Sequence, residues 1–339
     1  MKQKSVLITG VAGLIGSRFA DYVLSNTNYS VVGIDDLFGG YEENMPLESD
    51  RFTFCKMTLG EDSQGLDYIF KEHRPEYVFH FAAYAAEGLS PFIRNYNYKN
   101  NVLSTVSIIN CCITYDVKRL IYTSSMSVYG KGQNPTERFD ENQIPAPEDP
   151  YAISKYACEM DIKSAGCTHN LDWCILRPHN CYGIHQNIWD RYRNVLGIWM
   201  YQRLNNKPLT IYGDGEQTRA FSYIDDALPC IWKAAILPEA SKQIINLGGK
   251  KRYTINEACS VIQEVFGGNV LVQHLEARYE VKHAIPTFSK SVRLLGYEET
   301  VDLKEGLARM WEWAQKQPKR GRFKWPSYEI DKGIYSYWK

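Results

Sequence analysis

Short apolar runs rich in β-branched residues recur through the first half of the chain, with longer amphipathic segments between them. The runs predict strands at 5–9, 29–34, 52–55, 77–81, 119–123 and 172–176. The segments between them predict helices at 13–25, 66–73, 100–115 and 150–165. Because strands alternate with helices, we expect an α/β fold of the Rossmann type, with a doubly wound parallel sheet. Ligands bind such sheets at the carboxyl ends of the strands.

The pattern changes after residue 176. A helix rich in Tyr, Arg and Trp is predicted at about 190–204, and the stretch 211–219 is polar and rich in turn residues. We therefore expect a large lobe over 1–176 and a smaller C-terminal α/β lobe over 177–316. The lobes are interleaved, because segments near 223–247 (223–237 and 243–247) return to the large lobe. Residues 317–339 are expected to pack as a tail.

Composition narrows the class of protein. Lys and Arg together number 39, and so do Asp and Glu, so no net charge points to nucleic acid or membrane partners. The N-terminus runs directly into a strand without a signal-peptide pattern, and no apolar stretch reaches membrane-spanning length. The nine cysteines are scattered, and no pair has zinc-site spacing. These features predict a cytoplasmic protein without a metal site.

A glycine-rich turn follows the first predicted strand. Gly10 opens the turn, Gly13 lets the backbone approach a phosphate, and Gly16 lets the next helix pack closely on the strand. The free N–H groups at the start of that helix, around Leu14 and Ile15, suit a pyrophosphate. A strand–turn–helix that binds no ligand would use glycines in the same way. The surrounding sequence must therefore decide between a structural turn and a phosphate-binding turn.

That context comes from the second predicted strand, which ends in Asp35 and Asp36. An acid about 20 residues past the glycine turn lies where the hydroxyls of a dinucleotide ribose are bound. A carboxylate there repels a 2′-phosphate, so the sequence predicts NAD as cofactor in preference to NADP.

Tyr151 and Lys155 lie four residues apart, on one face of the helix predicted after Pro150. A free tyrosine has a pKa of about 10, too high for a base at neutral pH. A nearby ammonium group and a positive nicotinamide ring would favour the phenolate. Exposed Tyr and Lys pairs are common by chance, but here the serine cluster 123–127 and the glycine turn precede the pair.

The spacing Gly-x-x-Gly-x-x-Gly, the upstream serines and Tyr151-x-x-x-Lys155 together resemble the extended short-chain dehydrogenases/reductases. That branch is dominated by nucleotide-sugar epimerases and dehydratases, and the resemblance runs from residue 5 to about residue 315. It implies that residues 1–176 bind NAD and that 177–316 bind a nucleoside-diphosphate sugar. It also implies that Lys155 hydrogen-bonds the nicotinamide ribose and that Ser125 shares the reacting sugar hydroxyl.

The same resemblance assigns further residues. It places four more side chains or backbone positions at the cofactor: Ala82, Ala83, Asn101 and Pro178. It assigns Asn180, Arg219 and Arg278 to the sugar nucleotide, and a guanidinium suits a diphosphate. For each arginine, an ordinary surface charge is the competing interpretation.

The two residues after Ser125 bear on the reaction. Dehydratases of this family carry an acid pair there and GDP-mannose 3,5-epimerases a cysteine at the second position, whereas this chain has Met126 and Ser127. Neither side chain can exchange protons readily at neutral pH. The candidate catalytic set is therefore Ser125, Ser127, Tyr151 and Lys155, and 4-epimerisation is the reaction predicted. A GDP-sugar 3,5-epimerase, a 4,6-dehydratase, a 4-ketoreductase and a dinucleotide-sensing regulatory protein stay open as alternatives.

Two departures from the family affect the substrate. Galactose-type epimerases often carry a lysine two residues after the alanine pair, where this chain has Ala85, and their pocket-gating position aligns with Ala284. We expect a UDP-hexose or UDP-hexuronate as substrate. The family also implies a homodimer, formed by the helices predicted at 100–115 and 150–165.

Overall fold

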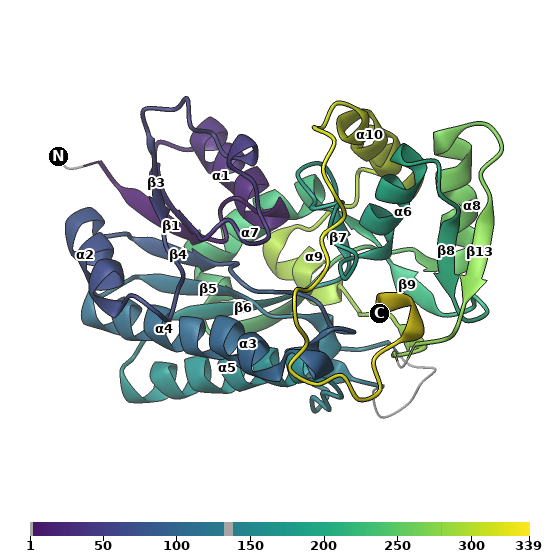
Figure 1. Cartoon of the computed structure of the whole chain (residues 1–339). Helices are drawn as coiled ribbons and strands as arrows, with labels where there is room; N and C mark the ends of the chain where they lie inside the picture. The colour runs from purple at the N-terminus through teal and green to yellow at the C-terminus, as the bar shows by residue number, and fades with distance from the viewer. Residues whose placement is uncertain (1–2, 132–137, 279) are drawn as a thin grey trace.

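A parallel sheet of seven strands forms the centre of the larger lobe in the computed structural model, which describes residues 3–131, 138–278 and 280–339 (Figure 1). The strand order is β11-β6-β5-β4-β1-β2-β3, a doubly wound arrangement. Its strands are β1 Ser5–Thr9, β2 Ser30–Asp35, β3 Phe52–Lys56, β4 Tyr77–His80, β5 Arg119–Thr123, β6 Trp173–Pro178 and β11 Gln243–Leu247. The six strands predicted from the apolar runs are confirmed, with ends that shift by at most two residues.

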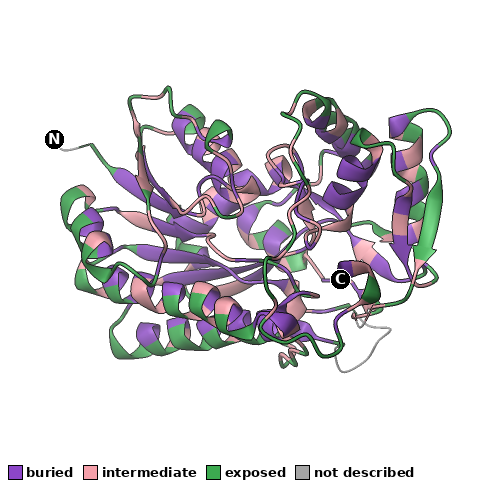
Figure 2. Cartoon of the chain, viewed as in Figure 1, coloured by how far each residue is buried: buried purple, intermediate pink, exposed green. Residues whose placement is uncertain are grey.

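Helices cover both faces of this sheet, and the side chains of β1 show how. Val6 and Ile8 pack with α1 (Leu14–Asn26) and α7 (Ile224–Ile236), whereas Leu7 points to the opposite face. That second face is covered by α2 Ser63–His73, α4 Ser104–Thr114 and α5 Pro150–Thr168. Figure 2 shows the result: the inner strands are buried, the edge strand β3 is partly exposed, and the helices are exposed on their outer faces. The fold class predicted from the sequence is confirmed.

Two predicted helices differ from the structure. The helix predicted at 100–115 consists of α3 (Arg94–Tyr98), a π-helical turn (Lys99–Leu103) and α4. The helix predicted from about residue 190 begins later, as α6 (Val195–Leu204). The Asn194 side chain caps α6 by accepting from the Leu196 N–H at 2.9 Å. Residues before Asn194 form a loop, since the Asp190 carboxylate accepts from the Tyr192 N–H at 2.9 Å.

The smaller lobe is built mainly from α6, α8 (Ile255–Phe266) and α10 (Leu303–Gln315), which share one apolar core. Its short strands are β7 Cys181–Tyr182 with β10 Ser222–Tyr223, β8 Leu209–Tyr212 with β13 Val272–Leu275, and β12 Arg252–Thr254 with β9 Thr218–Ala220 and β14 His283–Ala284. Segments 223–237 and 243–247 form α7 and β11 of the larger lobe. Helix α9 (Ser289–Leu295) also packs there, because Leu295 joins the core around α7. The boundary 177–316 therefore assigned α9 to the wrong lobe.

The tail, residues 317–339, runs from α10 across the front of the molecule (yellow in Figure 1). The Phe323 N–H donates to the Trp189 carbonyl at 2.9 Å in the smaller lobe. The Glu329 carboxylate accepts from the Asn95 N–H at 2.7 Å, at the start of α3 in the larger lobe. Apolar side chains of the tail, Trp338 among them, pack with residues that follow β4. The tail therefore connects the two lobes along one side of the space between them.

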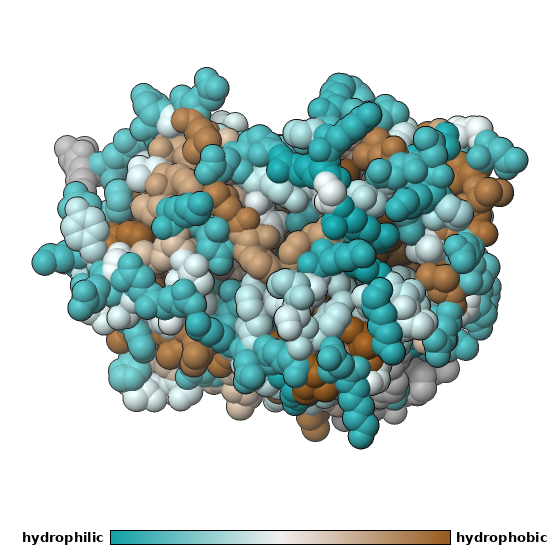
Figure 3. Space-filling model, in the orientation of Figure 1, coloured by the Kyte–Doolittle hydropathy of each residue, from teal (hydrophilic) through white to brown (hydrophobic). Residues whose placement is uncertain are grey.

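On the face shown in Figure 3, apolar residues form small patches separated by hydrophilic side chains. Among the described residues, no helix has both the length and the apolar character needed to cross a bilayer. The same residues contain no group of three or more His, Cys, Asp or Glu side chains placed to hold a metal ion.

Candidate active site

A cavity of about 680 Å³ lies between the lobes, at the carboxyl ends of the parallel strands. It brings together nearly all of the predicted site residues. These are Gly10, Gly13, Leu14, Ile15, Gly16, Asp35, Asp36, Ala82, Ala83, Ser125, Ser127, Tyr151, Lys155, Pro178, Asn180, Arg219 and Arg278. Asn101 is the exception.

Asn101 lies outside the cavity lining and stabilises the segments that form it. Its side-chain oxygen accepts from the Tyr84 N–H at 2.9 Å, and its Nδ2 donates to Ser154 Oγ at 3.3 Å. Asn101 therefore joins the loop after β4 to helix α5 and does not line the cavity. The structure thus shows a structural contact for Asn101, and its assignment to the cofactor stays a prediction.

The glycine turn has no room for side chains. Gly10 has φ of +71°, in the left-handed region, and a Cβ there would lie 2.8 Å from the Ala82 backbone nitrogen. A Cβ on Gly16 would lie 2.1 Å from the Gly10 carbonyl oxygen. The turn thus brings the start of α1 and the loop after β4 together at the cavity, as a dinucleotide phosphate requires.

Asp35 is held in place at the end of β2. One carboxylate oxygen accepts from the Ala12 N–H at 3.0 Å and the other from the Leu37 N–H at 2.8 Å. Burial raises the pKa of Asp35. Asp36 caps its own turn by accepting from the Phe38 N–H at 2.9 Å. Both carboxylates line the cavity where an adenosine ribose would meet the glycine turn.

Three hydroxyls and one ammonium group form the catalytic candidates. Ser125 Oγ accepts from the Ser127 N–H at 3.1 Å and from Ser127 Oγ at 2.9 Å. The Ser125 hydroxyl also lies near enough to the Tyr151 phenol to lower its pKa. Lys155 Nζ donates to the Thr123 carbonyl at 2.8 Å and lies 6.0 Å from the centre of the Tyr151 ring. The Ser127 side chain thus contacts the Ser125 hydroxyl, and any effect that it has on a substrate is expected to pass through Ser125.

The predicted shift of Tyr151 is not produced by the chain alone. Burial and the neighbouring Glu87 raise the pKa of the phenol above its usual value of 10, and the nearby Ser125 hydroxyl only partly opposes this. Burial also lowers the pKa of Lys155 to about 8. The expected shift towards the phenolate depends on the nicotinamide ring as well as on Lys155, so it stays a prediction for the protein with its cofactor bound. A further positive charge is needed at the ring.

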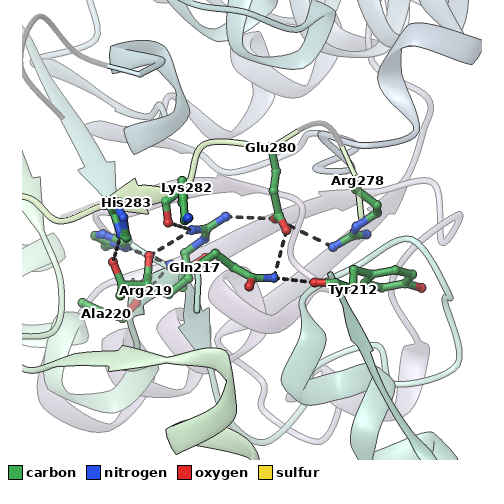
Figure 4. Close-up of polar contacts among 11 residues, drawn as sticks. Tyr212, Gln217, Arg219, Ala220, Arg278, Glu280, Lys282 and His283 are labelled. Carbon is green, nitrogen blue, oxygen red and sulfur yellow. Dashed lines mark hydrogen bonds and ion pairs between the residues drawn. The ribbon is translucent and has the colours of Figure 1, made fainter. Parts of the chain in front are cut away.

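Arg219 and Arg278 converge on one carboxylate at the smaller-lobe end of the cavity (Figure 4). Arg219 Nη2 donates to Glu280 Oε2 at 2.9 Å, and Arg278 Nη2 lies 3.9 Å from the same oxygen. The Arg278 guanidinium stacks 3.9 Å from the centre of the Tyr212 ring, and its buried Nε has no partner among the described residues. Two guanidinium groups around one carboxylate leave an excess positive charge, which suits a diphosphate.

Asn180 has a positive φ of +32° and lies at the turn after β6. Its Nδ2 donates to the Ala220 carbonyl at 3.0 Å and to His179 Nδ1 at 2.9 Å. His179 Nε2 donates to the Ala284 carbonyl at 2.9 Å, and burial lowers the pKa of this histidine to about 3. A neutral His179 therefore fixes Asn180 and the backbone of Ala284 at the cavity wall.

The cavity also contains charged residues that were not predicted from the sequence, among them Glu87, Arg193 and Glu280. Glu87 follows the alanine pair. Its side chain is exposed to the open cavity, where partial desolvation between the lobes and the nearby Asp149 raise its pKa to about 7. Its position in the loop after β4, at the carboxyl end of a parallel strand, was the sequence signal that could have identified it as a site residue. Arg193 comes from the loop before α6, and its side chain contacts residues more than a hundred positions earlier in the chain, so no local pattern could have identified it.

The glycine turn, Asp35 and the Tyr151–Lys155 pair fit a nicotinamide dinucleotide. The fold and the site define the class of the protein: an extended short-chain dehydrogenase/reductase that uses NAD. The chain belongs to the NAD dependent epimerase/dehydratase family, whose model matches residues 6–248.

Several characterised proteins are similar to this chain. It is 29% identical over 310 residues to the UDP-glucose 4-epimerase of Mycolicibacterium smegmatis, covering 90% of this chain and 97% of the relative. A structure of Thermotoga maritima UDP-glucose 4-epimerase with UDP-glucose has 30% identity and a TM-score of 0.84, covering 91% of this chain and 98% of that one. The complex of Bacillus cereus UDP-glucuronic acid 4-epimerase with UDP-glucuronic acid and NAD has 29% identity, a TM-score of 0.83 and the same coverage.

Proposed function

We propose that the protein is an NAD-dependent 4-epimerase of a nucleoside-diphosphate sugar, with a UDP-sugar as substrate. The observation that carries this proposal is the serine–tyrosine–lysine arrangement in a cavity that also contains two diphosphate-suited arginines. Ser125 and Tyr151 handle one sugar hydroxyl, while Met126 and Ser127 supply no acid pair for elimination of water.

In the proposed reaction, the Tyr151 phenolate takes the proton of the sugar 4-hydroxyl and later returns it. Bound NAD, held at the glycine turn and Asp35, would supply the reversible hydride acceptor for carbon 4, so that the hydride can return to the other face of the ketone. Ser125 donates a hydrogen bond to the reacting oxygen, with its own oxygen held by Ser127. Arg219 and Arg278 hold the diphosphate, so that the sugar can turn over between the two hydride transfers.

Glu87 bears on the choice of sugar. Its carboxyl lies in the cavity, where it interacts electrostatically with Tyr151, Arg219 and Arg278. It therefore lies between the reacting end and the diphosphate end, alongside the sugar ring. A carboxylate there accepts hydrogen bonds from sugar hydroxyls and repels a uronate, so a neutral UDP-hexose is favoured over a UDP-hexuronate.

The same residue favours one alternative reaction. A carboxyl group with a pKa of about 7 is suited to proton transfer at neutral pH. After oxidation at carbon 4, such a base could remove the acidic proton at carbon 3 or 5, which is the chemistry of a 3,5-epimerase. Glu87 thus supplies a base that Met126 and Ser127 do not.

One experiment separates these candidates. The purified protein is incubated in heavy water with UDP-glucose, UDP-glucuronate, UDP-N-acetylglucosamine or GDP-mannose and followed by proton NMR. A 4-epimer without ring deuterium supports the proposal, and faster conversion of a neutral sugar than of the uronate supports the role of Glu87. Deuterium at carbon 3 or 5 would favour the 3,5-epimerase. Bound NAD without any conversion would favour a dinucleotide sensor.

We also propose a homodimer formed through α5 and the π-helical turn before α4. Ile108 and Ile109, which lie in the helix predicted at 100–115, are buried in the core of the larger lobe. Leu103, Ile153 and Met160 are exposed instead. Light scattering after gel filtration should give twice the monomer mass, and replacement of Ile153 and Met160 by Glu should halve it.

A further inference from the structure

The loop after β4 lacks a cation of its own. Galactose-type epimerases resemble this chain but often have a lysine at the position of Ala85, and alanine supplies neither length nor charge. In the structure, the Arg193 side chain reaches this loop from the smaller lobe. Its Nη1 lies 3.3 Å from the Ala85 carbonyl oxygen, to which it donates. An arginine thus stands beside the small residue that replaces the lysine.

Arg193 is held on its inner side. Its Nε donates to Asp190 Oδ2 at 3.1 Å, and its guanidinium lies 4.4 Å from the centre of the Tyr84 ring. The Tyr84 hydroxyl donates to the same Asp190 oxygen at 3.0 Å. These contacts orient the planar end of the side chain, which lowers the entropy cost of binding an anion.

Arg193 lines the cavity, and its Nη2 lies close to the loop that follows β2. A Cβ on Gly39 would lie 2.7 Å from Arg193 Nη2, and a Cβ on the adjacent Gly40 would lie 2.5 Å from the Ala12 carbonyl carbon. Gly39 and Gly40 belong to one short loop after β2. Arg193 therefore contacts the loop that also contacts the glycine turn at Ala12. Nη2 makes no hydrogen bond with any of the residues that the structure describes.

The electrostatic influence of Arg193 agrees with this position. Its charge opposes the burial that raises the pKa of Asp35, and it opposes the rise in the pKa of Tyr151 as well. Asp35 marks the adenosine end of a bound dinucleotide and Tyr151 the nicotinamide end. A cation that acts on both lies near the middle of the dinucleotide, where its two phosphates are.

We propose that Arg193 is a cofactor-positioning residue that crosses from the smaller lobe and holds the pyrophosphate of NAD against the glycine turn. The guanidinium takes the place of the absent lysine and adds a fork of two donors. This inference rests on NAD as the cofactor of the family, and it is independent of which sugar the enzyme converts.

The test measures NAD binding without any sugar substrate. Arg193→Met and Arg193→Lys variants are compared with Arg203→Met, an arginine of α6 that donates to the Gly267 carbonyl at 3.1 Å and does not line the cavity. Each protein is passed through gel filtration, its NAD is released and quantified, and the stripped protein is titrated with NAD⁺ by tryptophan fluorescence. Loss of a charge-assisted contact predicts a Kd raised by about 10- to 100-fold in Arg193→Met.

Arg193→Lys should show a smaller loss, because it keeps the charge without the fork, and Arg203→Met should bind NAD as the wild type does. Gly39→Ala is a second approach, since its Cβ displaces Nη2 without removing the guanidinium. It should also weaken NAD binding. Unchanged NAD affinity in both Arg193→Met and Gly39→Ala would overturn the proposal. If affinity for UDP fell instead, Arg193 would belong to the sugar nucleotide. Wild-type protein that binds NAD normally but converts none of the sugar nucleotides would count against the proposed function alone.

Discussion

The hydroxyl of Ser127 donates to Oγ of Ser125 at 2.9 Å, so the position that decides between reactions in related enzymes here supports its neighbour. With the Ser127 N–H donating as well, at 3.1 Å, the Ser125 oxygen is saturated on one side. Its own proton is then directed towards Tyr151 and the space where a sugar hydroxyl would lie. A residue that lacks acid–base ability thus has a positional role.

A Ser127→Ala variant should keep its NAD and lose part of its turnover. One neutral hydrogen bond to Ser125 is removed while the backbone N–H remains, so kcat is expected to fall by about 3- to 10-fold. Ser125→Ala removes the group at the reacting oxygen and should lower kcat by about 100-fold or more. Steady-state rates with the best UDP-sugar measure both. Equal losses in the two variants would show that Ser127 contacts the substrate itself.

A Tyr151→Phe variant should bind NAD and UDP as the wild type does and lose about 100- to 10,000-fold in kcat, because the phenol transfers the substrate proton. Tyr156→Phe is the matched control, since Tyr156 lies on the same helix and does not line the cavity. Its activity should be unchanged. Comparable activity of the two variants would contradict a catalytic Tyr151.

Glu87→Gln should change how stability depends on pH. The pKa of Glu87 is raised from 4.5 to about 7 in the folded protein, so the folded state holds its proton more tightly than the unfolded state does. This group favours folding most below pH 4.5, and its contribution is lost as the pH rises to 7. Glutamine does not titrate. The difference in free energy of unfolding, variant minus wild type, should therefore increase between about pH 4.5 and 7 and then level off.

Urea denaturation of the two proteins at several pH values measures this difference. A difference that stays constant with pH would mean that Glu87 titrates normally. In the sugar site, the same variant should narrow the preference for neutral over acidic sugars, which competition between UDP-glucose and UDP-glucuronate would detect.

Gly16→Ala should abolish retention of NAD. The added Cβ would lie 2.1 Å from the Gly10 carbonyl oxygen, so the turn or the start of α1 must move. Gly321→Ala is the control, because nothing lies within 4 Å of its Cβ. The ratio of NAD to protein after gel filtration checks both variants. Full retention in Gly16→Ala would show that the turn can rearrange without loss of the dinucleotide site.

The sheet could be predicted from the sequence because its strands are short, apolar and β-branched, as buried parallel strands must be. Tyr77–His80 and Arg119–Thr123 are examples. The start of α6 could not be predicted from the sequence. The side chains of Asp190 and Asn194 accept hydrogen bonds from nearby backbone N–H groups, and these bonds prevent the helix from beginning earlier, as the composition would allow. Such competition depends on the conformation of a loop rather than on periodicity.

The site was predictable where local spacing carries the chemistry, as in the glycine turn and the Tyr151–Lys155 pair. Arg193 and Glu280 were missed because their roles depend on contacts between the lobes or between distant segments. The burial of Tyr151, which raises its pKa in the chain without cofactor, could not be predicted either, since a motif gives the partner of a group but not its burial.

The interleaved order of the chain limits how the protein can move. Since α7, β11 and α9 of the larger lobe alternate with strands of the smaller lobe, the lobes are joined by several backbone connections, and the tail adds another. A hinge would have to bend all of them together. A single proteolytic cut between the lobes should therefore leave two fragments that elute as one body. Exchange of substrate for product then depends on loops and side chains at the rim of the cavity, not on the lobes swinging apart.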